Sequence, residues 1–187
     1  MLKRILHDWH RYVLWAMLSV LIWAWIFSLV TKAPASKKVQ LFAELPAMRS
    51  EALEIALERE KPDGIAYVQA AQFDYAMIDQ TEVLYGDLYL VPESNAEAYL
   101  ASFAPIDRRL FPGASFYESQ GKAYGLLVYD EETGLSVGGE YVAYVPGERC
   151  YLFFRAESQH LGAWNDSTDD AAIRIAQNYL KLGEEQR

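Results

Sequence analysis

Cysteine and histidine, which supply most metal ligands and many catalytic groups, are scarce in this chain. Its 187 residues include one cysteine, Cys150, and three histidines, of which only His160 lies beyond residue 31. A disulfide framework and a zinc site built from cysteines or a histidine cluster are therefore excluded within one copy of the chain. Because Cys150 begins the apolar run 150–154, we expect a buried and unreactive thiol there.

Nucleotide-binding and calcium-binding motifs are also missing. The sequence contains neither a P-loop nor a G-x-G-x-x-G segment. The acidic groups at 130–132 and 166–170 lack the alternating spacing of a calcium loop, and a solvated turn and a helix cap account for them. We therefore predict no catalytic residue, no metal ion and no cofactor, and we favour a non-catalytic protein over an enzyme.

Basic residues are outnumbered, 17 against 26 acidic ones, and they are unevenly distributed. Three of the basic residues but only one acidic residue, Asp8, lie in the first 31 positions. The remainder of the chain is therefore strongly acidic. A domain of this charge is a poor candidate for binding nucleic acid, and we predict no nucleic-acid partner.

The most informative stretch of the chain is an uncharged run over residues 12–31. Twenty residues in an α-helix reach about 30 Å, the thickness of a bilayer's hydrocarbon core. Trp9, Tyr12 and Trp15 gather at one end of the run, where aromatic rings favour the membrane interface. We predict a transmembrane helix over 12–31, with residues 1–11 as a tail, 32–38 as a linker and 39–187 as a separate domain.

The positive-inside rule does not decide the orientation of this span. Three basic residues precede it and three follow closely, namely Lys3, Arg4, Arg11, Lys32, Lys37 and Lys38. The short tail favours a signal-anchor in a bacterial cell membrane, with residues 1–11 cytoplasmic and the domain extracytoplasmic. Two alternatives stay open: a cytoplasmic domain, and a signal peptide cleaved near Ala33–Ala35, although the apolar run is longer than usual for a cleaved signal.

Residues 39–187 are expected to form one α/β domain. Strands over 39–45, 65–71 and 87–91 alternate with helices beginning at Ser50, near Asp79 and at Ser94, the last with the capping box 94–97. This order predicts an open, mostly parallel βαβ sheet. The pairs 115–118 with 123–129 and 141–145 with 150–155 predict two added antiparallel hairpins, and a helix over 170–182 ends the domain.

Candidate ligand-binding residues follow from this topology. In open α/β sheets, ligands lie beyond the carboxyl ends of the strands. Those positions hold Phe73, Asp74 and Tyr75 after the second strand, and Glu93 and Ser94 after the third. With the hairpin residue Tyr124, they combine aromatic rings, carboxylates and a hydroxyl. We predict that they bind a small polar solute or a peptide.

Four segments in order carry a resemblance to a known family. They are DLYLVPES at 87–94, SFAPI at 102–106, GKAYG at 121–125 and YLFFR at 151–155. Their order resembles the first lobe of the extracellular solute-binding proteins of bacterial ABC importers, over residues 39 to about 157. The resemblance implies a periplasmic-binding-like single lobe and a transporter as partner. The chain departs from that family by offering one lobe only, and by a membrane helix where many members carry a lipidated cysteine.

These features favour a single-pass, membrane-anchored, non-catalytic binding or accessory module. Two alternatives of other classes remain. One is a membrane-tethered hydrolase that uses His160 with Asp166 or Asp169. The other is an interaction protein that acts through its tryptophan-rich span on a membrane protein partner. Substituting His160 by alanine would abolish only the hydrolase, and exchanging the span for a poly-leucine helix would abolish only the third function.

Overall fold

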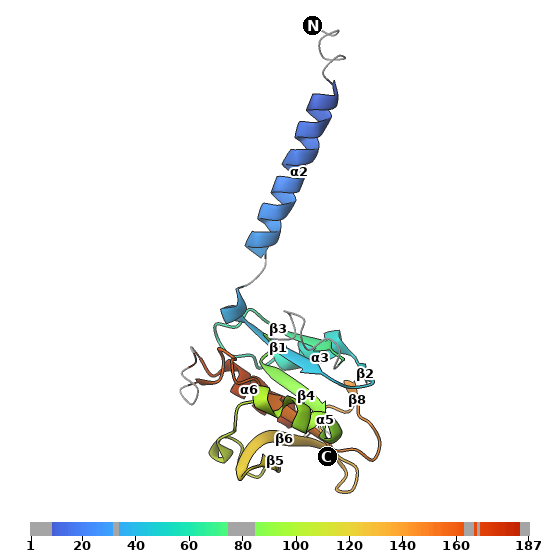
Figure 1. Ribbon diagram of the computed structural model, residues 1–187, viewed down its shortest axis with the longest axis vertical. Helices are drawn as coiled ribbons and strands as arrows, with labels where there is room; N and C mark the ends of the chain where they lie inside the picture. The colour runs from blue at the N-terminus through green and yellow to red at the C-terminus, as the bar shows by residue number, and fades with distance from the viewer. Residues whose placement is uncertain (1–8, 32–33, 75–84, 163–166, 168, 184–187) are drawn as a thin grey trace. The chain divides into compact units, whose positions relative to one another are not determined.

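The computed structural model describes residues 9–31, 34–74, 85–162, 167 and 169–183 (Figure 1). It divides the chain into two compact units, residues 1–34 and residues 35–187. Helix α2 (Trp9–Thr31) belongs to the first unit and begins three residues before the predicted span. The predicted helix near Asp79 lies outside the described residues.

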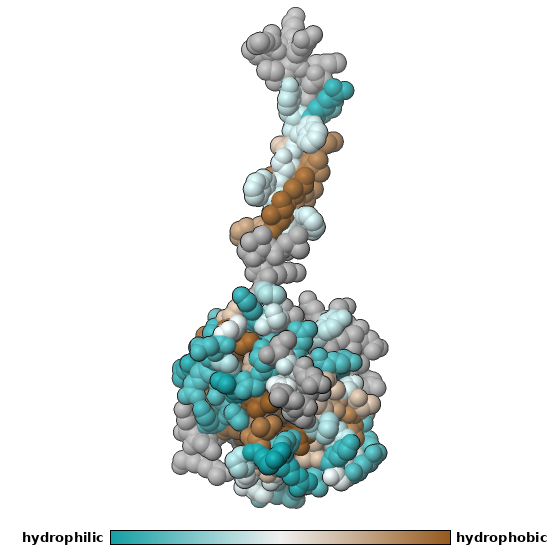
Figure 2. Space-filling view, turned by 90° about the vertical axis from the view of Figure 1, so that its left-hand side faces the viewer, coloured by the Kyte–Doolittle hydropathy of each residue, from teal (hydrophilic) through white to brown (hydrophobic). Residues whose placement is uncertain are grey.

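Helix α2 is the one helix of the described residues that is long and apolar enough to cross a membrane. None of the side chains from Trp9 to Phe27 is buried by the rest of the described chain. The exposed fractions of Trp23 and Phe27 are 70% and 68%. Figure 2 shows apolar side chains open along this helix. A helix whose large apolar side chains are exposed from Trp9 to Phe27 lacks the buried stripe of a soluble amphipathic helix.

The second unit is built on one mixed sheet in the order β3–β1–β4–β9–β6–β5. Strands β1 (Lys38–Ala43), β3 (Tyr67–Gln72) and β4 (Leu88–Pro92) pair in parallel, as the βαβ order predicts. Strands β9 (Cys150–Phe154), β6 (Lys122–Asp130) and β5 (Phe116–Ser119) add antiparallel pairings, and β7 (Leu135–Ser136) pairs with β6. A separate small pair joins β2 (Ala47–Met48) to β8 (Val142–Ala143).

Two helices cover one face of the sheet and a third covers part of the other. Helices α3 (Ser50–Glu58) and α6 (Ala171–Lys181) share an aliphatic core with the first face. Helix α5 (Glu93–Tyr99), which continues into a short 3₁₀ turn over Leu100–Ser102, packs on the other face. Further 3₁₀ turns cover Ala35–Lys37 and Arg108–Leu110.

The two faces differ because successive side chains of a strand point in opposite directions. In β1, Val39, Leu41 and Ala43 belong to the aliphatic core, whereas Phe42 belongs to an aromatic cluster on the other face. That cluster includes Tyr89 and Phe153, and most of its rings meet at tilted or edge-on angles. The strand predicted over 39–45 is thus confirmed, with bounds of Lys38–Ala43.

The hairpin predicted for 141–145 with 150–155 is wrong. Strand β8 pairs with β2, while β9 lies between β4 and β6 near the middle of the sheet. All five residues of β9 are buried, which suits a strand covered on both faces and not a hairpin arm. The hairpin of β5 with β6 is confirmed, and its turn places Gln120 and Gly121 at φ of 51° and 76°.

The capping box predicted at 94–97 is also wrong. Helix α5 begins at Glu93, its cap residue is Pro92, and no side chain caps the first turn from within the helix. Instead, the backbone N–H of Ser94 donates to the carboxylate of Glu148 at 3.1 Å. A carboxylate 54 residues away in the chain therefore replaces the local cap.

Candidate functional site

Strands β1 and β4 are neighbours, but the helices that follow them in the chain pack on opposite faces of the sheet. Helix α3, which follows β1, buries Leu53 and Leu57 in the aliphatic core. Helix α5, which follows β4, packs Ala96 and Tyr99 into the aromatic cluster. This divergence is a topological switch point, the place where open α/β sheets bind their ligands. The carboxyl ends of β1 and β4 are therefore the candidate site.

Glu44 occupies this point, directly after β1. Its backbone N–H donates to the carbonyl of Leu90 at 2.9 Å, and its carboxylate accepts a bond from the amide of Asn95 at 3.0 Å. Burial raises the pKa of Glu44, hydrogen bonds from Asn95 and Tyr99 oppose this shift, and the negative charges of Asp74 and Glu148 reinforce it. Glu44 therefore holds a proton more readily than an ordinary glutamate.

An open cleft of about 520 Å³ adjoins the carboxyl end of β4. It is lined by Glu93, Ser94, Asp130, Glu131, Glu132, Gly147, Glu148 and Arg149. Five carboxylates therefore face one guanidinium group. Such a lining favours a ligand that carries positive charge over an anion, and most of these carboxylates are exposed enough for salt to screen them.

Two turns that line this cleft, one after β6 and one before β9, are joined by hydrogen bonds. The backbone N–H of Gly147 donates to the carboxylate of Glu131 at 2.6 Å. Arg149 donates to Glu132 at 3.1 Å, and its Nε lies 3.5 Å from the buried carboxylate of Asp130. These contacts hold the turn after β6 against the turn before β9, so the position of the cleft is fixed by the sheet.

The structure brings together some of the predicted site residues and separates others. Glu93 and Ser94 line the cleft, and Asp74 is exposed and close enough to Glu44 to raise its pKa. Phe73 is buried, with its ring 5.8 Å from that of Tyr89, so it belongs to the aromatic cluster. Tyr75 lies outside the described residues.

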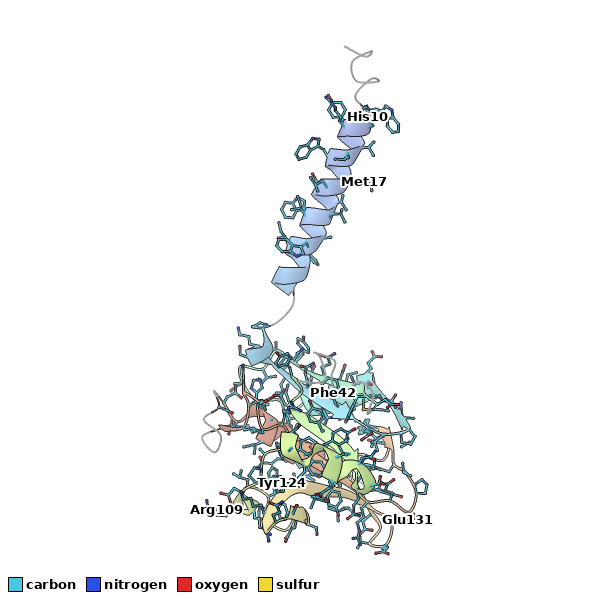
Figure 3. The ribbon with its side chains drawn as sticks, viewed as in Figure 1. His10, Met17, Phe42, Arg109, Tyr124 and Glu131 are labelled. Carbon is cyan, nitrogen blue, oxygen red and sulfur yellow. The ribbon has the colours of Figure 1, made fainter. Side chains whose placement is uncertain are left out.

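Tyr124 lies apart from the cleft, at the far end of β6 from Glu131 (Figure 3). It is half-buried against the aromatic cluster. The site residues that sequence reasoning missed are Glu44, Asn95, Asp130, Glu131, Glu132, Glu148 and Arg149. Position could have identified Glu44, which comes directly after the first strand, but nothing local marks the two turns as neighbours.

A second polar cluster is buried at the other end of the parallel strands. The carboxylate of Asp87 accepts bonds from the backbone N–H of Gln40 at 2.8 Å and from the hydroxyl of Ser158 at 2.6 Å. Burial raises the pKa of Asp87 because it removes the carboxylate from water, and the hydrogen bonds from Ser158 and Gln40 oppose this shift. The backbone N–H of His160 donates to the same Ser158 oxygen at 3.1 Å.

His160, the residue of the hydrolase hypothesis, extends this cluster to helix α6. Its Nδ1 lies 2.7 Å from a carboxylate oxygen of Asp169, which also accepts a bond from the backbone N–H of Ala171 at 2.9 Å. The carbonyl of His160 accepts from Ala172 at 3.0 Å. The contacts connect β1 to the start of α6, and the adjoining cavity holds only about 70 Å³. Asp166 lies outside the described residues.

Residues 134–138 spell GLSVG, a G-x-S-x-G pattern that sequence reasoning overlooked. In the nucleophile elbow of hydrolases, such a serine sits on a sharp turn between a strand and a helix. Ser136 instead ends the two-residue strand β7, which pairs antiparallel with β6 and is followed by turns. The backbone context of a nucleophile is therefore missing around this serine.

In the part of the chain that the structure describes, no group of three or more histidine, cysteine, aspartate or glutamate side chains is arranged to hold a metal ion. Burial raises the pKa of Cys150 far above its ordinary value, so the thiolate is disfavoured. This agrees with the expectation of a buried and unreactive thiol.

The chain matches no protein-family model, and no curated protein or solved structure is significantly similar to it. The resemblance to a solute-binding lobe therefore stays a prediction from the sequence.

Proposed function

We propose that this chain is a single-pass membrane protein whose α/β domain acts outside the cytoplasm as a non-catalytic binding or accessory module. The observation that supports it is helix α2, whose side chains from Trp9 to Phe27 are not buried by the rest of the described chain. In water, that surface would be a strong aggregation liability, whereas a bilayer satisfies it. The compact domain that follows is separate and large enough for its own core.

The cleft at the carboxyl end of β4 is the proposed binding site of this module. Its ligand would be a small polar solute or a peptide that carries an amine or guanidinium group. Its position beside the carboxyl end of β4, one of the two strands at the switch point, its volume and its carboxylates support this choice. A transporter in the same membrane is the proposed partner, on the strength of the sequence resemblance alone.

Membrane anchoring and orientation can be tested on the full chain in bacterial cells. After cell lysis, the protein should float with membranes in a density gradient and resist extraction by carbonate at high pH. In spheroplasts, added protease should remove the domain while a cytoplasmic marker protein stays intact. Recovery in the soluble fraction would refute the anchor, and a domain cut only after the membrane is opened would refute the orientation.

Ligand binding can be tested by thermal unfolding of the full chain in detergent micelles. The probes are spermidine, arginine amide, a Lys-Ala-Lys tripeptide and, as uncharged comparisons, glucose and glycerol. A cation at one hundred times its dissociation constant should stabilise the folded state by about 2.7 kcal/mol. Glu93→Gln with Glu148→Gln should remove the shift, and Glu51→Gln with Glu118→Gln, the same charge change elsewhere, should keep it. No shift with any cation, or equal shifts in both double variants, would refute the cleft as the binding site.

The hydrolase alternative keeps one supporting contact, the hydrogen bond between His160 and Asp169. His160→Ala tests it, because only a hydrolytic activity of the full chain would depend on that imidazole. The alternative that acts through the span is tested by exchanging residues 12–31 for leucines. Loss of a co-purified membrane partner in that variant, with cation binding unchanged, would favour it.

A further inference from the structure

In the described part of the sheet, strand β3 forms one edge, and its own sequence contains none of the features that usually protect an edge strand. Its six residues, YVQAAQ, include no charge, proline or glycine. Uncharged edge strands invite pairing with another chain, and proteins usually interrupt them with charges, prolines or bulges. The opposite edge strand, β5, has such features, since Glu118 carries a charge and a register shift separates Tyr117 from Glu118.

Three side chains that follow one another along α3 and the turn after it occupy the outer edge of β3. Glu54 accepts a bond from the backbone N–H of Ala70 at 2.8 Å, and Glu58 accepts one from the N–H of Val68 at 3.0 Å. The ammonium group of Lys61 donates to the carbonyl of Ala66, the residue directly before β3. We call these three side chains, Glu54, Glu58 and Lys61, the edge cover.

The geometry of helix and strand explains why the contacts match. Residues four apart on a helix are about 6 Å apart along its axis, and alternate N–H groups of a strand are about 6.6 Å apart. As the chain rises from Glu54 to Lys61, the partners descend from Ala70 to Ala66. The edge cover therefore satisfies β3 in the order that an antiparallel neighbouring strand would follow.

We propose that the edge cover closes β3 against pairing with a second copy of this chain. A second copy is the occupant that the strand favours, because two β3 edges placed antiparallel about a two-fold axis are self-complementary. The strand adds no charge that would repel a copy of itself. The carboxylates supply acceptors to the same N–H groups that a second strand would use, so cover and partner exclude each other.

The decisive variant is Glu54→Ala with Glu58→Ala, studied as the full chain in detergent micelles. Light scattering on the eluted complexes gives the protein mass as concentration increases. For this double alanine variant, we expect the protein mass to increase with concentration to twice the mass of the wild type. Glu51→Ala with Asp63→Ala, which removes the same charge from exposed positions nearby, should keep the wild-type mass. A double variant at positions 54 and 58 that keeps the wild-type mass at every concentration would overturn the proposal.

Glu54→Gln with Glu58→Gln separates the hydrogen bonds of the edge cover from its negative charge. The amide oxygens still accept bonds from Val68 and Ala70, so this variant should keep the wild-type mass. If it doubles its mass as the alanine variant does, repulsion between charges explains the wild-type state and the edge cover does not.

Hydrogen exchange resolved to single amides tests the same idea without relying on any variant to fold. In the wild type, the amides of Val68 and Ala70 should exchange slowly although they face an edge. In the alanine variant, they should exchange quickly at low concentration and slowly again as the mass doubles. Fast exchange of both amides in the wild type would overturn the edge cover.

Discussion

Gly125 of β6 lies directly opposite Phe153 of β9, so closely that a β-carbon at position 125 would stand 2.6 Å from a ring carbon. Real β-carbons essentially never come so near, and Phe153 itself is stacked on Phe103 with ring centroids 4.5 Å apart. The ring of Phe153 therefore packs between the backbone of Gly125 and the ring of Phe103. This packing explains why position 125, the second glycine of the GKAYG segment, has no side chain.

Gly125→Ala should therefore destabilise the domain by about 1–3 kcal/mol, the usual cost of forcing extra volume into a packed core. Chemical denaturation of the full chain in micelles measures it. In a Phe153→Leu background, where the smaller side chain leaves room, the same substitution should cost clearly less. Equal costs in both backgrounds would show that the ring does not limit position 125.

The thiol of Cys150 provides a test of the buried middle of the sheet. Because Cys150 is buried and burial raises its pKa far above the ordinary value, a thiol reagent at pH 8 should react with the native protein very slowly. In denaturant, the same thiol should react within minutes. Fast labelling of the native chain would mean that the start of β9 opens to solvent, contrary to its place between β4 and β6.

Asp87 should make the stability of the domain depend on pH in the direction opposite to most carboxylates. Its pKa is raised by burial from an ordinary value of 3.8, so the folded state binds its proton more tightly than the unfolded chain does. This favours folding below pH 3.8, and the advantage is lost as pH rises from 3.8 through the raised folded pKa.

Asp87→Asn removes this titration. The unfolding free energy of the variant should rise relative to the wild type over that pH range, by at most about 1.4 kcal/mol per pH unit. Because Asp87 belongs to a hydrogen-bonded cluster with other polar groups, the measured quantity is the difference between the two proteins and not either curve alone. A difference that falls with increasing pH would show that hydrogen bonds, and not burial, dominate at Asp87.

The sequence predicts what depends on local periodicity. The alternation of Leu41 and Phe42 assigns the two faces of β1, and the apolar run 88–91 indicates a strand covered on both faces. Both outcomes follow from side-chain direction, which is a property of each strand alone. The location of Glu93 and Ser94 also follows from the sequence, since position after a strand is enough to place them at its carboxyl end.

What the sequence does not predict depends on neighbours distant in the chain. Glu148 caps the N–H of Ser94 across 54 residues, and Glu54 satisfies an edge amide of Ala70. From the local sequence, Glu148 is predicted to lie in a turn and Glu54 on the solvent-exposed face of a helix. Similarly, Pro146 and Gly147 predict a turn correctly, but not that the strands on either side of it pair with other strands.

The pairing of Glu44 with Asn95 tests the switch point itself. The hydrogen bond from Asn95 lowers the pKa of Glu44, against the larger effect of burial. Asn95→Ala should therefore raise that pKa further and leave a carboxylate at neutral pH with one bond fewer. The variant should lose stability most at pH 7, and the loss should shrink toward pH 4 as Glu44 takes up its proton.

Asn178→Ala, which removes an exposed side-chain bond to the carbonyl of Glu60, should cost the same at both pH values. If the cost of Asn95→Ala were likewise independent of pH, Glu44 would not be the group that this amide holds, and the charge of the proposed site would have to come from the cleft residues alone.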